Sequence, residues 1–208
     1  MELMNKEEHL NCYLRNKQEA IILYLAKIKG DTFFSNENYN QMLFLLKGKI
    51  RFQNQNKYQI NNIFEERTFL MFSKSHKYAM NVEEDSDIII INMYNEINFC
   101  HHFPLETLYE LNEEHATHEH SIYPLKINEM ISDYLDIVVK SISEGLKCSY
   151  FQELKQKELL FYLRAYYPKK DLAAFFAPIL NRDIKFSGLI YRNYESAKNI
   201  EELASLAH

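Results

Sequence analysis

Residues 41–53 read QMLFLLKGKIRFQ, two apolar runs separated by Lys47 and Gly48. Short apolar runs broken by Asn, Gly, Lys and Asp clusters are typical of strands in a small all-β domain. The Lys47-Gly48 pair predicts a tight hairpin, because glycine adopts the positive φ that such a turn needs. By the same rule about seven strands are predicted, at 20–27, 41–46, 49–53, 57–60, 68–73, 77–82 and 86–94. Strands this short need two facing sheets or a barrel to bury both faces.

The hydrophobic period changes after these strands. Apolar residues recur at three- and four-residue steps over 127–142, which predicts a helix that ends at Gly145. A second helix is predicted from about 150 to 167, because Pro168 disfavours helical backbone in the residue before it. The two helices are predicted to form a hairpin.

The last part of the chain predicts short helices. The first is DLAAFFAPIL, with Asp171 as its N-cap. Near the end, Asn199-x-x-Glu202 has the form of a capping box and opens IEELASLA. Between the strands and the helical hairpin, residues 112–120 (NEEHATHEH) are polar and acidic, and a domain boundary is predicted there.

Composition and charge exclude several classes of protein. A chain of 208 residues with 47% hydrophobic residues buries a core, so global disorder is excluded. A net charge of -5 argues against a strong DNA binder, because such domains commonly have a pI above ~9. The four glycines are too scattered for a phosphate-binding loop. Three cysteines without a CxxC pair, and no apolar run of ~18 residues, predict a soluble cytoplasmic protein.

The stretch 45–50 (LLKGKI), followed by strand, turn and strand, resembles the hairpin of a cupin-like barrel. Cupin enzymes hold a metal with two His and a Glu, and the resemblance puts those positions near Ser35, Glu37 and Gln41. None of them offers an imidazole, which leaves His76 as a possible fourth ligand. A barrel without metal or other cofactor is therefore predicted.

The barrel interior either binds a small molecule or is filled by its own side chains. A binding pocket would set a few oriented polar groups among aromatic rings. The candidate effector-binding residues are Tyr24, Phe44, Arg51, Phe72, His76 and Tyr78. Strand alternation does not decide which face is inside, because both faces are largely apolar.

A histidine cluster, His115-x-x-His118-x-His120, lies among Glu113, Glu114 and Glu119 and has enough ligands for zinc. A structural site also needs fixed geometry and supporting hydrogen bonds, whereas this stretch has the composition of a solvated segment. No metal site and no catalytic residues are predicted, so the chain is not expected to be an enzyme.

The apolar stripe of the first predicted helix is either core or a dimer seam. The candidate dimerisation residues are Ile127, Met130, Ile131, Tyr134, Leu135, Val138 and Ile142. A two-helix hairpin covers only one side of its apolar surface, so a homodimer is predicted.

Residues 154–208, from LKQKELLFYLRAYY to the end, resemble the linker and the start of the DNA-binding domain of AraC-family transcriptional regulators, particularly the Bacteroides-type members. The most telling stretch runs from Phe186 through Asn193 to Ile200-Glu-Glu-Leu-Ala204. The strands and the helical pair are similar to that family's N-terminal effector-binding and dimerisation domain.

The resemblance implies an α+β fold with a cupin-like antiparallel β-barrel, a helical dimerisation hairpin and short C-terminal helices. It divides the chain into a barrel with an N-terminal arm (1–110), a helical dimerisation and linker region (121–180) and the start of a helix-turn-helix domain (181–208). Family members continue into a recognition helix, which reads bases in the major groove, so the domain is expected to be truncated.

The implied function is the ligand-sensing and dimerising part of a transcription factor. The implied partners are a second copy and an unidentified small-molecule effector, with no membrane, and with DNA only through the full-length parent protein. Residues 1–17 are predicted to cover the barrel mouth. The alternatives are a metal-dependent cupin enzyme, a regulator that binds metal through His115, His118 and His120, and a dimerisation module whose barrel binds nothing.

Overall fold

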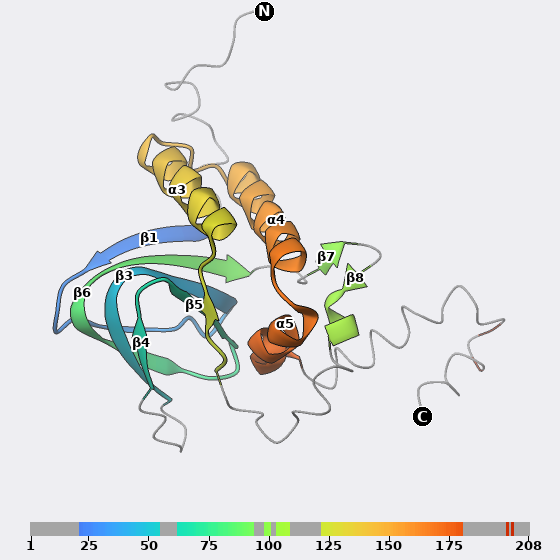
Figure 1. The fold of residues 1–208 in the computed structure, drawn as a ribbon, viewed down its shortest axis with the longest axis horizontal. Helices are drawn as coiled ribbons and strands as arrows, with labels where there is room; N and C mark the ends of the chain where they lie inside the picture. The colour runs from blue at the N-terminus through green and yellow to red at the C-terminus, as the bar shows by residue number, and fades with distance from the viewer. Residues whose placement is uncertain are drawn as a thin grey trace, which may run out of the picture.

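The structure is a computed structural model of the chain, and it describes residues 21–54, 62–93, 98–100, 103–108, 122–180, 199 and 201. It has the predicted α+β class, with an antiparallel sheet followed by helices (Figure 1). The strands are β1 (Ile22–Lys27), β2 (Thr32–Phe34), β3 (Asn40–Asn54), β4 (Asn62–Glu65), β5 (Thr68–Phe72), β6 (Tyr78–Met93), β7 (Asn98–Cys100), β8 (Phe103–Pro104) and β9 (Leu125–Lys126). The helices are η2 (Leu105–Leu108), α3 (Glu129–Ser143), α4 (Ser149–Tyr166), α5 (Lys169–Phe176) and η4 (Ala177–Ile179).

Two long strands, β3 and β6, bend and take part in two layers of the sheet. In the first layer, the N-terminal half of β3 pairs with β5 and with the C-terminal half of β6, which in turn pairs with β1. The short strand β9 pairs with β5 and extends this layer. The other halves of β3 and β6 pair with β4 and β2 and form the second layer. Side chains from both layers meet in a cluster that we call the inner cluster, which includes Leu43, Leu45, Phe52, Phe72 and Tyr78.

The predicted hairpin at Lys47-Gly48 is wrong, because β3 runs through both residues. Gly48 has φ 92°, as the sequence requires, but it lies in an irregular stretch where the β3–β6 register shifts. A Cβ at Gly48 would lie 2.5 Å from the Asp85 carbonyl oxygen, so this backbone approach excludes any side chain. The glycine therefore allows one strand to bend between the two layers.

The other strand predictions are confirmed in part. Strands were predicted at the positions of β1 and β5, and the runs 77–82 and 86–94 join into the single strand β6. The prediction missed the short strands β2, β4, β7, β8 and β9. The predicted strand at 57–60 lies outside the described residues.

Both predicted helices of the hairpin are confirmed as α3 and α4. The Asn128 side chain accepts a hydrogen bond from the Ile131 amide and caps α3. Gly145, with φ 101°, follows the end of α3 in the left-handed conformation that glycine adopts at helix ends. The Tyr134 hydroxyl of α3 donates to the Lys155 carbonyl of α4 at 2.7 Å and fastens the two helices together.

The third predicted helix is also present, but its N-cap is Pro168 rather than Asp171. The helix α5 begins directly after the proline, so Asp171 lies inside the first turn. An acidic side chain there is favourable, because the helix dipole is positive at its N-terminus.

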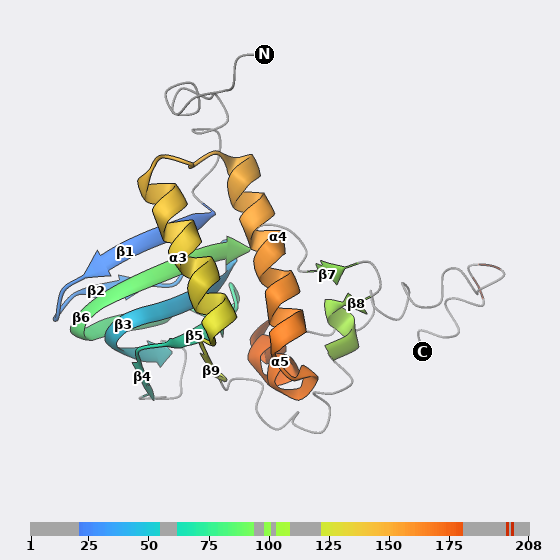
Figure 2. The same cartoon turned by 45° about the horizontal axis from the view of Figure 1, so that its top comes forward.

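The helices cover the face of the first layer that points away from the inner cluster (Figure 2). Buried residues of α3, α4 and α5, including Ile131, Leu159 and Phe175, pack with Phe44 and Phe69 of the sheet in what we call the helix-side cluster. The Phe69 ring lies 4.9 Å from the Phe44 ring and 4.9 Å from the Phe175 ring. The first layer is therefore buried on both faces.

Candidate functional site

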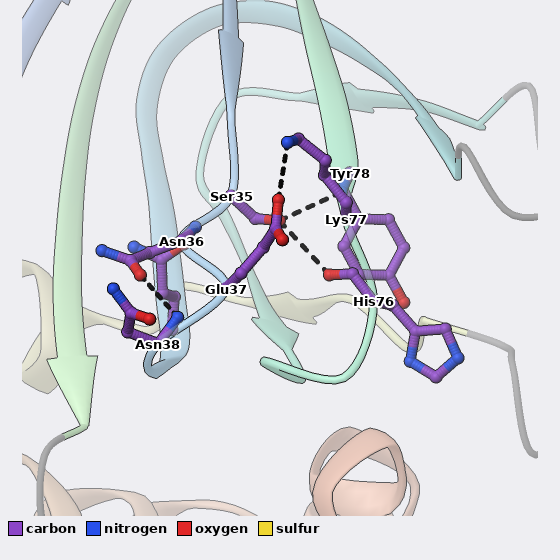
Figure 3. Close-up of polar contacts among 8 residues, drawn as sticks. Ser35, Asn36, Glu37, Asn38, His76, Lys77 and Tyr78 are labelled. Carbon is purple, nitrogen blue, oxygen red and sulfur yellow. Dashed lines mark hydrogen bonds and ion pairs between the residues drawn. The ribbon is translucent and has the colours of Figure 1, made fainter.

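Two loops meet at one end of the inner cluster, which we call the loop end (Figure 3). One loop follows β2 and starts at Ser35, and the other carries His76 and leads into β6. The Ser35 amide donates to the Tyr78 carbonyl at 3.0 Å, and the Tyr78 amide donates to the Ser35 hydroxyl at 3.0 Å. The same hydroxyl donates to the His76 carbonyl at 3.4 Å. One buried serine therefore fastens the two loops.

A buried pair of amide side chains lies next to this serine. Gln41 of β3 donates from Nε2 to Oδ1 of Asn92 in β6 at 2.7 Å. Its Oε1 accepts from the Asn36 amide at 2.7 Å. Because Gln41 and Asn92 face the inner cluster and are almost fully buried, they give the apolar interior a polar end.

Charged residues lie farther out, on the rim of the loop end. The Lys77 ammonium lies 2.6 Å from the Glu37 carboxylate (Figure 3). Both side chains are exposed, so this ion pair neutralises the rim and adds little stability.

Tyr78 is 2% exposed, and its ring lies 4.9 Å from the Phe72 ring and 5.9 Å from the Phe52 ring. Within the described part of the chain, its hydroxyl makes no hydrogen bond. Burial raises the pKa of this phenol, so it stays neutral at physiological pH. A buried hydroxyl without a partner is unfavourable, and a ligand atom next to it would remove that cost.

The second layer fills its own side of the interior. The Phe52 ring stacks on Phe64 at 4.6 Å and meets Phe72 edge-on at 5.8 Å. These rings are therefore packed against one another and against the first layer.

Three of the six predicted effector-binding residues, Phe72, His76 and Tyr78, come together at the loop end. The other three lie elsewhere. Phe44 belongs to the helix-side cluster. Tyr24 is 42% exposed and its hydroxyl donates to Asp87. Arg51 donates to the Glu83 carboxylate at 2.7 Å on the outer surface.

Sequence reasoning did not single out Asn92. A weak signal was present, because Asn92 interrupts the apolar run IIIINMY and Gln41 stands at the start of the apolar run QMLFLL. Such residues stand out only once the pairing of Gln41 with Asn92 across β3 and β6 is known.

The loop end does not fit a cupin metal centre. The resemblance assigned three positions to ligands. Ser35 and Gln41 carry a hydroxyl and an amide that are engaged in hydrogen bonds with the protein. Glu37 alone of the three carries a carboxylate, and it is exposed on the rim and paired with Lys77. Divalent transition metals prefer imidazole or carboxylate ligands. Among the described residues no group of three or more His, Cys, Asp or Glu side chains could hold a metal ion. His115, His118 and His120 lie outside those residues.

The predicted dimerisation stripe is used inside this chain. Five of its residues are buried in the helix-side cluster, Met130 is half-buried, and Ile142 packs against the cluster from its edge; the five are Ile127, Ile131, Tyr134, Leu135 and Val138. A dimer seam through these side chains stays a prediction, and it would require α3 to leave its own sheet.

No protein-family model and no curated protein matches the chain. Among solved structures it is similar to ToxT from Vibrio cholerae O395, an AraC-family regulator bound there to (E)-4-(8-methylnaphthalen-1-yl)but-3-enoic acid. The TM-score is 0.47 and the identity 14%, over 88% of this chain and 69% of ToxT.

Two matches with a shared β fold cover less of the chain. The Drosophila melanogaster CENP-C cupin domain matches with TM-score 0.33 and 9% identity, over 38% of this chain and 64% of that domain. An oxalate decarboxylase from Bacillus subtilis matches with TM-score 0.33 and 10% identity, over 46% of this chain and 30% of the enzyme. At these scores the likenesses describe a general architecture and carry no argument about function.

Within the described part of the chain, α3, α4 and α5 are each too short or too polar to cross a bilayer.

Proposed function

We propose that this chain is the ligand-sensing and dimerising part of an AraC-like transcription regulator. The resemblance of residues 154–208 to the linker and first DNA-binding helices of that family supports the proposal. The order of elements agrees with it, because the sheet comes first and the α3–α4 hairpin is docked on the sheet. Contact with DNA is proposed only for the full-length parent protein.

The observation that carries the proposal is that α4 is apolar on two opposite faces. One face is buried against the sheet through Leu159 and Leu163. On the other face Tyr150, Leu154 and Phe161 are 74%, 57% and 53% exposed. These three residues lie within about 40° of each other around the helix, at 100° per residue. A helix that is apolar on both faces needs a second partner besides the sheet. If two copies pack by twofold symmetry, the outer stripe of α4 in each copy covers the outer stripe of the other.

This assignment moves the proposed dimer seam from the stripe of α3 to the outer face of α4. The α3 stripe is already used against the sheet, whereas no described segment covers the outer face of α4, where Tyr150, Leu154 and Phe161 are exposed. Ile137 of α3 is also exposed.

The loop end is proposed as the sensing site. A ligand there would be small and largely apolar, with one group that hydrogen-bonds the Tyr78 hydroxyl. On the rim of this site the Lys77 ammonium is paired with the Glu37 carboxylate, which favours an uncharged ligand over an anionic one.

Sedimentation of the double variant Leu154→Glu/Phe161→Glu tests the dimer. We expect the unmodified chain to be a dimer and this variant to be a folded monomer. Ile63→Glu is the matched control, because Ile63 is also exposed and apolar but lies on β4. A monomeric unmodified chain, or a variant that stays dimeric, would overturn the α4 seam.

A thermal-shift screen with small apolar alcohols and phenols tests the sensing site. Compounds that raise the melting temperature of the unmodified chain should lose this effect in Tyr78→Phe and keep it in Tyr24→Phe. Tyr24 is the control because it is an exposed tyrosine on the face of β1 that points away from the inner cluster. An effect retained in Tyr78→Phe would contradict the proposed site.

A further inference from the structure

Two buried glutamines of α4, Gln152 and Gln156, contact the sheet one helical turn apart. Gln156 donates from Nε2 to the Met93 sulfur at 2.8 Å. Gln152 accepts from the Ile22 amide through Oε1 at 2.8 Å, across 130 residues of sequence. Of these two glutamines, Gln152 is therefore the one that is hydrogen-bonded to β1.

The Ile22 amide needs this partner because β1 is at the edge of the sheet. In an antiparallel strand, successive residues direct their backbone groups to opposite sides. The Ile21 carbonyl accepts from Asn92 of β6, so the Ile22 amide points to the side where no described strand pairs with β1. Because Ile22 is buried, water does not replace a missing partner for its N–H.

The other end of the same side chain is attached to the turn between α3 and α4. Gln152 donates from Nε2 to the Lys147 carbonyl at 2.7 Å. The Lys147 amide in turn donates to the Gly145 carbonyl at 2.9 Å. In Figures 1 and 2 the start of β1 lies beside the N-terminal half of α4, next to this turn.

We propose that Gln152 is a joint that makes the start of β1 and the α3–α4 turn one cooperative unit. Each end of the amide is held by a backbone group of a different segment, so displacement of either segment breaks the geometry of the other bond. Coupling of this kind is reciprocal, and loosening the turn also loosens β1. The inference does not depend on the proposed function, although in a sensor this joint would connect the sheet with the helical hairpin.

The test loosens the turn and measures amide hydrogen exchange at Ile22. Gly145→Ala does so without touching Gln152 or β1, because an alanine is strained at φ 101°. In a background with Gln152, we expect Gly145→Ala to speed exchange at Ile22 by about tenfold. In a Gln152→Met background, where a side chain of similar length lacks the hydrogen bonds, Gly145→Ala should have no further effect at Ile22. Such a double-mutant cycle isolates the coupling.

Gln156→Met is the matched control background. It removes a buried amide from the same face of α4 but leaves the Ile22 and Lys147 bonds in place, so the effect of Gly145→Ala should persist there. If Gly145→Ala leaves Ile22 exchange unchanged, or speeds it equally with and without Gln152, the joint is refuted.

If Gln152→Met does not fold, Gln152→Glu replaces it as the background in which the effect of Gly145→Ala on Ile22 exchange is measured. The carboxylate still accepts from the Ile22 amide but no longer donates to Lys147, so the sheet edge stays covered while the link is cut. The joint again predicts that Gly145→Ala no longer affects Ile22, and a persisting effect would refute it. These readouts involve neither dimer nor ligand, so failure of the joint and failure of the proposed function are distinguishable.

Discussion

The two faces of the first layer are both apolar, yet they are covered in different ways. Along β3, Met42 and Phe44 face the helices, while Leu43 and Leu45 face the inner cluster. The helix-side cluster is closed by three helices from a distant part of the chain. The inner cluster is closed by the other halves of the same two strands together with β2 and β4. Among the described residues, its loop end is bounded by the turns that carry Ser35 and His76.

The two faces of the first layer therefore differ in the segments that bound them. On the face covered by helices, a cavity left by a smaller side chain is expected to collapse little, because side chains from several separate segments pack there. The loop end is bounded by short turns and contains a buried hydroxyl without a partner in the described chain. The helix side, by contrast, holds the α3–α4 hairpin on the sheet.

The largest expected effect comes from truncating one phenylalanine on each face. Phe44→Ala should lower the free energy of unfolding by about 3–5 kcal/mol, because Phe44 is fully buried and stacks on Phe69. Phe52→Ala should fall at the low end of that range, since the cost depends on how well the site collapses around the cavity. Urea unfolding measures both.

Phe34→Ala, at an exposed position of β2, is the control and should change stability by less than about 0.5 kcal/mol. A larger loss for Phe52→Ala than for Phe44→Ala would reverse the comparison and make the inner face the rigid one.

The sequence predicted the helices well and the sheet only in part. The α3 stripe and the Gly145 and Pro168 boundaries are local signals, so the prediction of α3 and α4 needed no tertiary information. The Lys47-Gly48 pair also carried a correct local signal, a positive φ, but a hairpin and a bend in a long strand share it. Only the pairing with β6, which closes around Gly48, separates the two.

For a related reason, only three of the six candidate effector-binding residues, Phe72, His76 and Tyr78, lie together at the loop end. Alternation along β3 places Phe44 and Leu45 on opposite faces, but apolar residues on both faces leave the inside undetermined. Phe44 was therefore assigned to a pocket, although it faces the helices. The partners of Tyr24 and Arg51, Asp87 and Glu83, lie more than thirty residues away and come near only through the fold.

A second prediction concerns the serine that fastens the loop end. Ser35→Ala should cost about 2 kcal/mol, because it leaves the buried Tyr78 amide without an acceptor. Hydrogen exchange at Tyr78 should rise, while the amides of α3 keep their protection. An equal rise in both places would mean that the loop end and the helix side unfold together.

The third prediction concerns Tyr134, which joins α3 to α4 on the helix side. Tyr134→Phe should cost about 1 kcal/mol through loss of the bond to the Lys155 carbonyl. Burial, with a smaller effect of the nearby Glu158 carboxylate, raises the pKa of Tyr134 above its ordinary value of 10.0. The unfolded chain therefore releases this proton first, and stability should fall as the pH rises above about 10.

Melting temperatures between pH 7 and 11 check this sign. The alkaline fall should be smaller in Tyr134→Phe than in the unmodified chain. It should not vanish, because burial also raises the pKa of Tyr78 and of Tyr167. An unchanged alkaline fall in the variant would show that Tyr134 ionises as easily in the folded chain as in the unfolded one.

The smallest expected change in stability comes from a substitution on the outer surface, away from the inner cluster and the helix-side cluster. Arg51 lies between Ile50 and Phe52 of the inner cluster, but its side chain points outward to Glu83. Because both partners are about one-third exposed, Arg51→Gln should cost less than about 1 kcal/mol, and the cost should shrink in high salt. Compounds that stabilise the unmodified chain should stabilise this variant equally. If the variant loses that response while it keeps its stability, Arg51 contacts the ligand, and the binding site extends beyond the loop end to the outer surface of the second layer.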